Sequence, residues 1–196
     1  MSFYETMDKK RKDRIDCFKF QKDKNLSLGA GVLLKLALEK EGIVDFIIQS
    51  TKKGKPYLAE NKALFFNLSH SGEIAMCTLA SCNVGCDVEK IKSKPPNITR
   101  MFVNEQEDKN QFYKLWTAKE SYLKMTGDGF FKNPKDIVIK LPFGSQVVEN
   151  KAVTFFDLSM AAMSHTGKSY QITVCAEGEF ANEDIKVETV DLSTIC

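Results

Sequence analysis

The chain has 196 residues, of which 43% are hydrophobic and 28% charged, and its formal net charge is +2. This size and balance predict a soluble globular protein with one sizeable core or two small, closely packed domains. The small net charge argues against a general nucleic-acid binder, and the lack of an apolar run of about 20 residues argues against a membrane span. The first residues show no apolar segment of signal-peptide type, so we expect a cytoplasmic protein.

The cysteines show no CxxC spacing, and most stand in apolar stretches that read as strands. We therefore expect reduced thiols that behave as small hydrophobic side chains, not a disulfide framework or a zinc site. The six residues are Cys17, Cys77, Cys82, Cys86, Cys175 and Cys196.

Residues 9–24 hold eight Lys or Arg against three Asp. Such a segment is a solvated face, a nucleic-acid arm or a grip on a phosphorylated ligand, and the residues alone leave all three open. Apolar residues then recur at helical spacing over 23–41, with Asp23 as a candidate cap and Gly42 as a stop. A strand is expected at 43–50, followed by a turn at 51–54.

Residues 65–89 are the most informative stretch of the chain. We expect a strand at 65–68, a polar turn at 69–72, a strand at 73–80 and a third strand that ends in Asp87-Val88-Glu89. Alternation along a strand places Asp87 and Glu89 on one face, where their charges repel unless a cation lies between them. Oxygen ligands of this kind favour Mg²⁺. The alternative is an ordinary strand with a solvated acidic edge.

Residues 94–97, with two consecutive prolines, mark the expected boundary between an N-terminal half (1–94) and a C-terminal half (95–196). A short helix at 98–104 and a second long helix at 107–125 follow, the latter ended by Gly127. Strand-like runs occupy 136–141, 152–158, 170–177 and 185–192. The predicted class is α+β, with a helix and antiparallel strands in each half. A faint echo of residues 69–80 at 164–176 hints at duplicated halves, although Ser164 and His165 read as plain loop residues.

The second long helix carries Trp116, Lys119, Glu120 and Lys124 in the segment WTAKESYLK. Glu120 and Lys124 are four residues apart and share a helix face. One interpretation is a surface ion pair worth a few tenths of a kcal/mol. The other makes Glu120 the third carboxylate of a metal site with Asp87 and Glu89, with Lys124 beside it to neutralise phosphate charge.

The ordered series GKP, FNLSHSG, GCDVE and WTAKESYLK resembles the signature motifs of the 4′-phosphopantetheinyl transferases. The similarity runs from about residue 11 to residue 131 and points to the longer, single-chain subgroup of the surfactin-synthetase activator type. The resemblance implies a pseudo-dimer of two similar halves in one chain. It also implies transfer of the phosphopantetheine arm of coenzyme A to a serine of an apo acyl or peptidyl carrier protein, with release of 3′,5′-ADP.

The resemblance also assigns roles to residues. Asp87, Glu89 and Glu120 match the family's magnesium positions, Glu120 further matches the proposed general base, and Lys124 matches a lysine beside the phosphates. The positions that match coenzyme A contacts are Arg11, Arg14, Ser27, Lys55, Ser69 and His70.

Two other functions compete with this interpretation. The basic segment, with Phe18 and Phe20 interleaved, is one candidate for single-stranded nucleic-acid binding. A coenzyme A-binding protein without transferase activity is the other. For the transferase we expect an active monomer in which Met101 and Phe102 face the carrier protein and Phe112 lies in the core.

Overall fold

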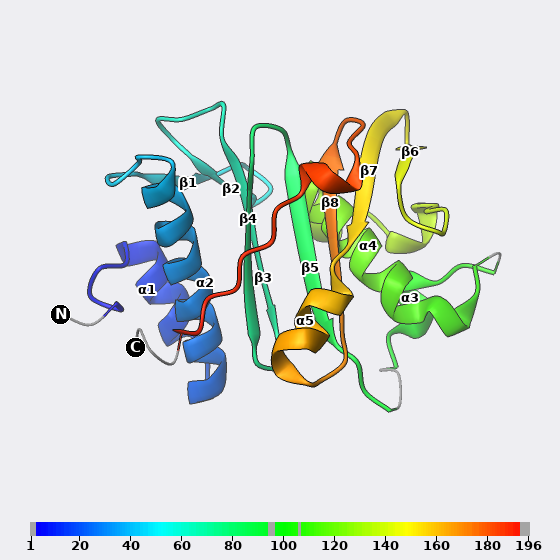
Figure 1. The fold of residues 1–196 in the computed structure, drawn as a ribbon, viewed down its shortest axis with the longest axis horizontal. Helices are drawn as coiled ribbons and strands as arrows, with labels where there is room; N and C mark the ends of the chain where they lie inside the picture. Colours follow the sequence, from blue (N-terminus) through cyan, green and yellow to red (C-terminus); the bar gives the residue numbers. More distant parts are fainter. Residues whose placement is uncertain (1–2, 94–96, 106, 193–196) are drawn as a thin grey trace.

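The computed structural model describes residues 3–93, 97–105 and 107–192. Strands β4, β3, β5, β8, β7 and β6 follow one another across the molecule, with α1 and α2 at one side of the view and α4 behind β8 and β7 (Figure 1). The helices are α1 (Lys9–Asp16), α2 (Gln21–Lys40), α3 (Thr99–Phe102), α4 (Phe112–Thr126) and α5 (Ser159–Thr166). The strands are β1 (Ile48–Ser50), β2 (Pro56–Leu58), β3 (Phe65–Ser71), β4 (Ile74–Ala80), β5 (Val84–Lys90), β6 (Ser145–Val148), β7 (Lys151–Asp157) and β8 (Tyr170–Glu177).

The first half is built from α2 and the β3–β4 hairpin. Leu34 and Leu38 of α2 are buried against Phe66 of β3 in one apolar cluster, as expected for an amphipathic helix on a sheet. The hairpin turns at Gly72, whose φ of 65° favours glycine. A Cβ at this position would lie 2.5 Å from the Tyr170 hydroxyl oxygen, so glycine also permits the turn to pack against β8.

The second half is built from α4 and an antiparallel sheet in the order β5-β8-β7-β6. Tyr122 and Leu123 of α4 pack with Val153 and Phe155 of β7 and with Cys175 of β8 in the largest apolar cluster of the described residues. Each half therefore pairs one long helix with antiparallel strands. The predicted α+β pseudo-dimer fold is confirmed.

Strand β5 lies between the two halves. It follows β4 directly in the chain, yet its backbone pairs with β8 from Val84↔Ala176 to Lys90↔Tyr170. The β3–β4 sheet and the four-stranded sheet are therefore separated between β4 and β5. This point comes before the expected boundary at residues 94 and 95. The proline pair that marked this boundary lies outside the described residues, and the division into 1–94 and 95–196 stays a prediction.

Several element predictions are confirmed. The segments expected as a helix at 23–41 and as strands at 152–158 and 170–177 form α2, β7 and β8. Gly127 ends α4 in the left-handed conformation with φ of 75°, although this helix begins at Phe112 and not at residue 107. Asp23 does not cap α2, because that helix begins two residues earlier and Phe20 stands at the cap position without a side-chain bond.

Two predicted strands are wrong. In the segment 136–141, Ile137 and Ile139 are buried as the apolar alternation suggested. However, both backbone groups of Lys140 bond to the side-chain amide of Gln146, so no ladder forms there.

The segment 185–192 crosses from the second half toward α2 without joining a sheet (Figure 1). Ile185 packs against the cluster that contains Val84 and Cys86 of β5, and Leu192 lies 2.8 Å from the position of a Cβ on Gly29 of α2, whereas Val187 is exposed. Glu188 pairs with Lys40 of α2. Ser164 and His165 also differ from the prediction, because they lie in α5 and not in a loop. The strand expected at 43–50 is formed only by β1 (Ile48–Ser50). A further difference, at Ser69 and His70, concerns the site itself.

The cysteines of the described part, Cys17 to Cys175, are all free thiols. Cys196 lies outside that part. Cys86 and Cys175 are buried and Cys77 and Cys82 are half-buried, as expected for small hydrophobic side chains, whereas Cys17 is exposed. No helix among the described residues is both long and apolar enough to cross a membrane.

Candidate active site

The two carboxylates of β5 are held from β3. The Ser69 hydroxyl donates to Asp87 Oδ1 at 3.0 Å, and the Ser71 hydroxyl donates to Glu89 Oε2 at 2.9 Å. Asp87 is only 4% exposed and Glu89 is half-buried. The predicted shared face of Asp87 and Glu89 is therefore present, and it faces a strand that presents a hydroxyl to each carboxylate.

The same polar side chains of β3 also join the two sheets. Backbone N–H groups of β5 donate to side-chain oxygens of β3 at every second position, where a neighbouring strand would normally offer carbonyls. The three bonds are Cys86 N to Asn67 Oδ1 at 3.1 Å, Val88 N to Ser69 Oγ at 3.3 Å and Lys90 N to Ser71 Oγ at 3.2 Å.

The expected turn at 69–72 is wrong for this reason. Residues that read as turn formers by composition instead continue β3 to Ser71, because their side chains serve as the acceptors for β5. Consecutive strand residues point to opposite faces, so His70 projects away from the face that holds Ser69.

Gly85 explains why α4 lies directly on β5. A Cβ on this residue would lie 2.0 Å from the Ser121 carbonyl oxygen and 2.4 Å from the Met125 nitrogen, so the glycine of GCDVE allows the close approach. That approach brings Lys124 to the strand, where its Nζ donates to Asp87 Oδ1 at 2.6 Å and to Ser69 Oγ at 3.0 Å.

Negative charge exceeds positive charge around this contact. Burial, followed by repulsion from Asp87, raises the pKa of Glu89 to about 7. Burial and Asp87 likewise raise the pKa of Glu120. Burial opposes the charge on Lys124, but attraction by Asp87 and by neighbouring groups that include Glu120 together outweighs it, and the pKa of this lysine is raised. Three carboxyl groups in electrostatic contact thus share one lysine, an arrangement that a further positive charge would relieve.

A divalent cation fits the site at Asp87. The Oδ2 atom of this residue is buried and has no hydrogen-bond partner in the described residues, and a carboxylate oxygen of this kind is a ligand that Mg²⁺ prefers. Within the same residues, no group of three His, Cys, Asp or Glu is arranged to hold a metal ion. Asp87, Glu89 and Glu120 are therefore electrostatic neighbours that are not assembled as a three-carboxylate cage in this structure.

A second cluster, of basic residues, includes Arg11 and Arg14 of α1 and His70 of β3. His70 is half-buried and lies edge-on to Phe18, with 6.0 Å between the ring centroids. Burial lowers the pKa of His70, and the positive charges of Arg14 and Lys124 lower it further. Burial and Arg14 also lower the pKa of Arg11.

Neither arginine forms an ion pair with a carboxylate of the described chain. The surplus positive charge suits a phosphorylated ligand. The Asp8 side chain caps α1, which the sequence reading missed, and this helix carries both arginines.

Two further predicted coenzyme A residues, Ser27 and Lys55, lie on other segments than α1 and β3. Ser27 is 1% exposed in α2, and its hydroxyl has no partner among the described residues. Lys55 donates to the carbonyl oxygen of Met125 and to Asn83 Oδ1 at 3.3 Å, so it sits at the C-terminal end of α4. Burial lowers the pKa of Lys55 to about 8.

The expected carrier-facing residues divide between surface and core. Met101 is 59% exposed, as predicted, but Phe102 is only 7% exposed. The prediction for Phe102 is wrong because its ring packs against Trp116, with centroids 5.6 Å apart. Phe112 is buried in the same aromatic cluster, which confirms its assignment to the core.

Two residues of the site region were missed from the sequence. Lys119 is fully buried and donates to the Phe102 carbonyl oxygen at 2.6 Å and to Glu107 Oε2 at 2.7 Å, which ties the segment after α3 to α4. Ser71 holds Glu89. The signal for Ser71 was the alternation N-x-S-x-S at 67–71, which matches the spacing of D-x-E at 87–89 once both are read as strands.

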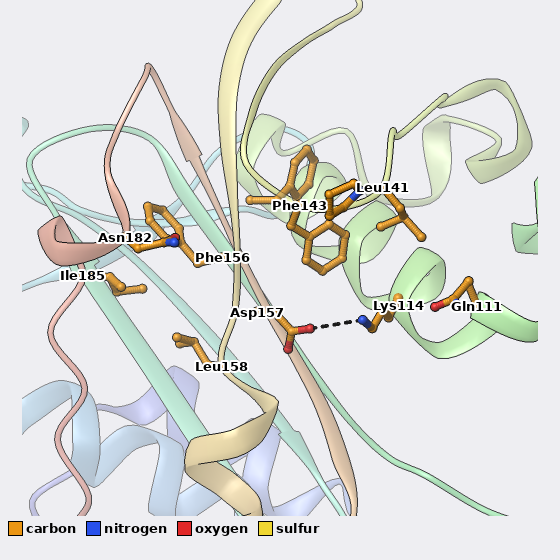
Figure 2. A pocket seen from close by; sticks show the side chains of 11 residues that line it. Gln111, Lys114, Leu141, Phe143, Phe156, Asp157, Leu158, Asn182 and Ile185 are labelled. Carbon is orange, nitrogen blue, oxygen red and sulfur yellow. Dashed lines mark ion pairs between the residues drawn. The ribbon is translucent and has the colours of Figure 1, made fainter.

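A cavity of about 660 Å³ lies in the second half, away from these residues. Figure 2 shows Leu141 and Phe143 on one side, Asn182 and Ile185 on the other, and the Lys114–Asp157 pair (3.7 Å) between them. None of the predicted site residues lines it. Its walls are formed by Gln111, Lys114, Leu141, Pro142, Phe143, Phe155, Phe156, Asp157, Leu158, Asn182 and Ile185.

Comparison with protein families agrees with this arrangement. A model of the 4′-phosphopantetheinyl transferase superfamily matches residues 83–175, and a model described as 4′-phosphopantetheinyl transferase, N-terminal, matches residues 1–83. The two matches meet at residue 83, next to the point where the sheets separate. The chain belongs to the 4′-phosphopantetheinyl transferase superfamily, and its class of enzyme is a transferase.

Individual relatives give the same result at modest identity. A 4′-phosphopantetheinyl transferase of Bacillus subtilis is 25% identical over 207 residues, which cover 92% of this chain and 87% of the relative. The 4′-phosphopantetheinyl transferase HetI of a Nostoc species is 35% identical over 46% of this chain and 45% of its own length. The human L-aminoadipate-semialdehyde dehydrogenase-phosphopantetheinyl transferase is 29% identical over 60% of this chain and 47% of its own.

Proposed function

We propose that this protein transfers the 4′-phosphopantetheine group of coenzyme A to a serine of an apo acyl or peptidyl carrier protein, with Mg²⁺, and releases 3′,5′-ADP. The observation that carries the proposal is the buried, unpartnered Oδ2 of Asp87 among Glu89, Glu120 and Lys124. This cluster has the charge deficit and the oxygen ligands that a magnesium-dependent phosphoryl-group transfer requires.

In the proposed reaction the carrier serine oxygen forms a bond to the β-phosphorus, and the bond from that phosphorus to the bridging oxygen breaks. Asp87 and Glu89, with Glu120, would hold Mg²⁺, which supplies Lewis-acid stabilisation of diphosphate charge when it is bound. Glu120 accepts the serine proton, directly or through water, and its raised pKa suits a general base. Lys124 is cationic and offsets charge on the departing 3′,5′-ADP.

The basic cluster of α1 and β3 is the proposed site for the phosphates of coenzyme A. Neither Arg11 nor Arg14 forms an ion pair with a carboxylate of the described chain, and burial together with the positive charges of Arg14 and Lys124 lowers the pKa of His70. We extend the proposed coenzyme A set to Ser27, Lys55 and Ser69. The unpartnered hydroxyl of Ser27 supports the first of these, and the contact of Ser69 with Lys124 supports the last.

The decisive experiment is to incubate the protein with coenzyme A, Mg²⁺ and an apo carrier protein and to measure the intact mass of the carrier. We expect a gain of one phosphopantetheine group that disappears when EDTA removes the metal. Coenzyme A binding without any mass gain on several carrier types would instead support a non-catalytic coenzyme A-binding protein. Salt-dependent nucleic-acid binding that coenzyme A does not affect would support the nucleic-acid alternative.

The proposed enzyme acts as a monomer, because Asp87 and Glu89 on β5 and Glu120 on α4 come from one chain and lie in mutual electrostatic range. Met101 is the proposed apolar anchor for the carrier, since it is exposed directly before the buried Phe102. Light scattering during turnover would test the oligomeric state. A Met101→Ala variant with a raised KM for the carrier and an unchanged KM for coenzyme A would support the anchor.

A further inference from the structure

Glu89 depends on a single hydroxyl for its orientation. Asp87 receives hydrogen bonds from both Ser69 and Lys124, whereas the Glu89 side chain receives one, from Ser71, among the residues described. The nearby lysines are engaged elsewhere, since Lys90 pairs with Glu73 and Lys124 pairs with Asp87. Glutamate also has one more rotatable bond than aspartate, so without an anchoring hydrogen bond its carboxylate can occupy more positions.

The Ser71 hydroxyl is itself fixed by the fold. Its oxygen accepts the Lys90 N–H at 3.2 Å while its proton goes to Glu89 Oε2. The turn that follows is pinned, because the Glu73 N–H donates to the buried Tyr170 hydroxyl at 3.0 Å and Gly72 packs beneath that hydroxyl. The position of the hydroxyl is therefore determined by β5 on one side and by the turn on the other.

We propose that Ser71 is a positioning residue for the metal site: it holds one oxygen of Glu89 and leaves the other free to face the cation that Asp87 binds. This inference rests on the proposed function for the identity of the cation, Mg²⁺. Residues that orient a metal ligand in this way typically account for about 10- to 100-fold in metal affinity or activity.

The chain offers a matched control at Ser159. Its hydroxyl likewise donates to a carboxylate, Asp157, and accepts a strand N–H, from Ile172 at 3.1 Å. Ser159→Ala thus removes the same pair of bonds in the second half, among residues that we do not place in the metal site. Ser71→Thr keeps the hydroxyl and adds a methyl group that a half-buried strand position tolerates.

The test is a calorimetric titration of MgCl₂ into the intact protein with coenzyme A present and no carrier, so that no turnover occurs. We expect Ser71→Ala to weaken Mg²⁺ binding by about 10-fold or more, and Ser71→Thr and Ser159→Ala to stay within about twofold of the unmodified protein. At saturating Mg²⁺, Ser71→Ala should regain most of its kcat, because the hydroxyl acts on the ligand and not on the reacting atoms.

Equal Mg²⁺ affinity in Ser71→Ala and the unmodified protein would overturn the proposal. So would a loss of affinity in Ser159→Ala that matches its loss of thermal stability, because the effect would then be structural. A protein that binds Mg²⁺ but modifies no carrier would refute the proposed transferase function alone. In that case the titration would still decide the role of Ser71.

Discussion

Two ion-paired lysines of helix α4, Lys119 and Lys124, have similar distances to their partners but different environments. Lys119 lies 2.7 Å from Glu107, and Lys124 lies 2.6 Å from Asp87. The side chain of Lys119 is fully enclosed beside the aromatic cluster and meets one carboxylate and one carbonyl. Lys124 retains 29% exposure and meets Asp87 with two further acids, Glu89 and Glu120, in electrostatic range.

The comparison shows that charge balance around an ion pair separates a structural pair from a reactive one. At Lys119 one positive charge meets one negative charge, and the pair holds a loop on a helix. At Lys124 one positive charge faces three carboxyl groups, of which Glu89 and Glu120 have raised pKa values. A buried carboxylate oxygen without a partner among the described residues occurs in both pairs, at Asp87 Oδ2 and at Glu107 Oε1, so the charge balance and not the unpartnered oxygen distinguishes them. An imbalance of this kind persists in a folded protein when a ligand completes it, which is why such groups gather at functional sites.

The largest expected effect is on stability, when the buried ion pair of Lys119 and Glu107 is broken. Lys119→Met leaves Glu107 buried without a counter-charge, and removal of one partner from such a pair costs about 3–5 kcal/mol in the free energy of unfolding. Urea denaturation followed by tryptophan fluorescence measures this directly, since Trp116 belongs to the adjacent cluster.

The control is the double variant Lys119→Met with Glu107→Leu. We expect it to recover most of the loss, because both charged groups are then replaced by apolar ones. A double variant as unstable as the single one would show that the lysine acts through packing of its stem and not through its charge.

A substitution among the carboxylates around Lys124 should reduce activity without reducing stability. Asp87→Asn keeps an oxygen for Ser69 and Lys124 but removes the charge, so we expect kcat to fall by more than the roughly 100-fold typical of residues that only support a ligand. Its melting temperature should not decrease, because one of three mutually repelling carboxylates is gone. Unfolding of this variant at the assay temperature would contradict the division between the two lysines.

The basic cluster of α1 should affect substrate affinity more than the chemical step. Arg14→Ala removes a charge-assisted contact, and we expect the KM for coenzyme A to rise by about 10-fold or more with a smaller change in kcat. Lys10→Ala is the matched control, since Lys10 lies on the same helix and bonds to Ser50. Equal effects of the two substitutions would mean that α1 attracts coenzyme A by general charge alone.

The smallest expected effect is the pH dependence of metal use. The pKa of Glu89 is raised to about 7 from its ordinary 4.5. The folded, metal-free protein therefore keeps a proton that the unfolded chain releases, and this group makes the protein less stable as pH rises from about 4.5 to about 7. Mg²⁺ binds the ionised form, so the Mg²⁺ concentration for half-maximal transfer should fall by roughly tenfold between pH 6 and pH 8.

A Glu89→Gln variant provides the comparison, because it carries no proton to displace. Its half-saturating Mg²⁺ concentration should be higher and flat with pH. A steep pH dependence that survives in this variant would assign the titration to another group, such as Glu120, whose pKa is also raised.

The carboxylates of the site were predictable because their signal is local. The spacing of Asp87 and Glu89 alone predicts that they share a strand face. Gly85, which allows the close approach of α4, lies two residues before Asp87. Ser71 and Lys119 were not predictable in the same way. Their partners lie 18 and 12 residues distant in the chain, and only the folded structure brings these groups together.

The fold showed the same limit. The alternation at 136–141 correctly indicated buried Ile137 and Ile139. It could not reveal that the Gln146 side chain would form hydrogen bonds with both backbone groups of Lys140. Composition misled at residues 69–71 for a related reason. Serine favours turns when its side chain bonds to its own backbone. Here the side chains of Ser69 and Ser71 accept backbone N–H groups of β5 instead and join the two sheets.

The pairing of β5 with β8 has a consequence for the order in which a newly made chain can fold. The α2 helix and the β3–β4 hairpin are assembled from neighbouring residues and can form early, but the strand that bears Asp87 and Glu89 pairs with residues 170–177. Contacts of such long sequence separation form slowly, because loop-closure entropy must be overcome first. During synthesis the strand that bears Asp87 and Glu89 therefore keeps one edge unpaired until residues 170–177 have left the ribosome. The proposed metal site therefore forms after the first half of the fold has assembled.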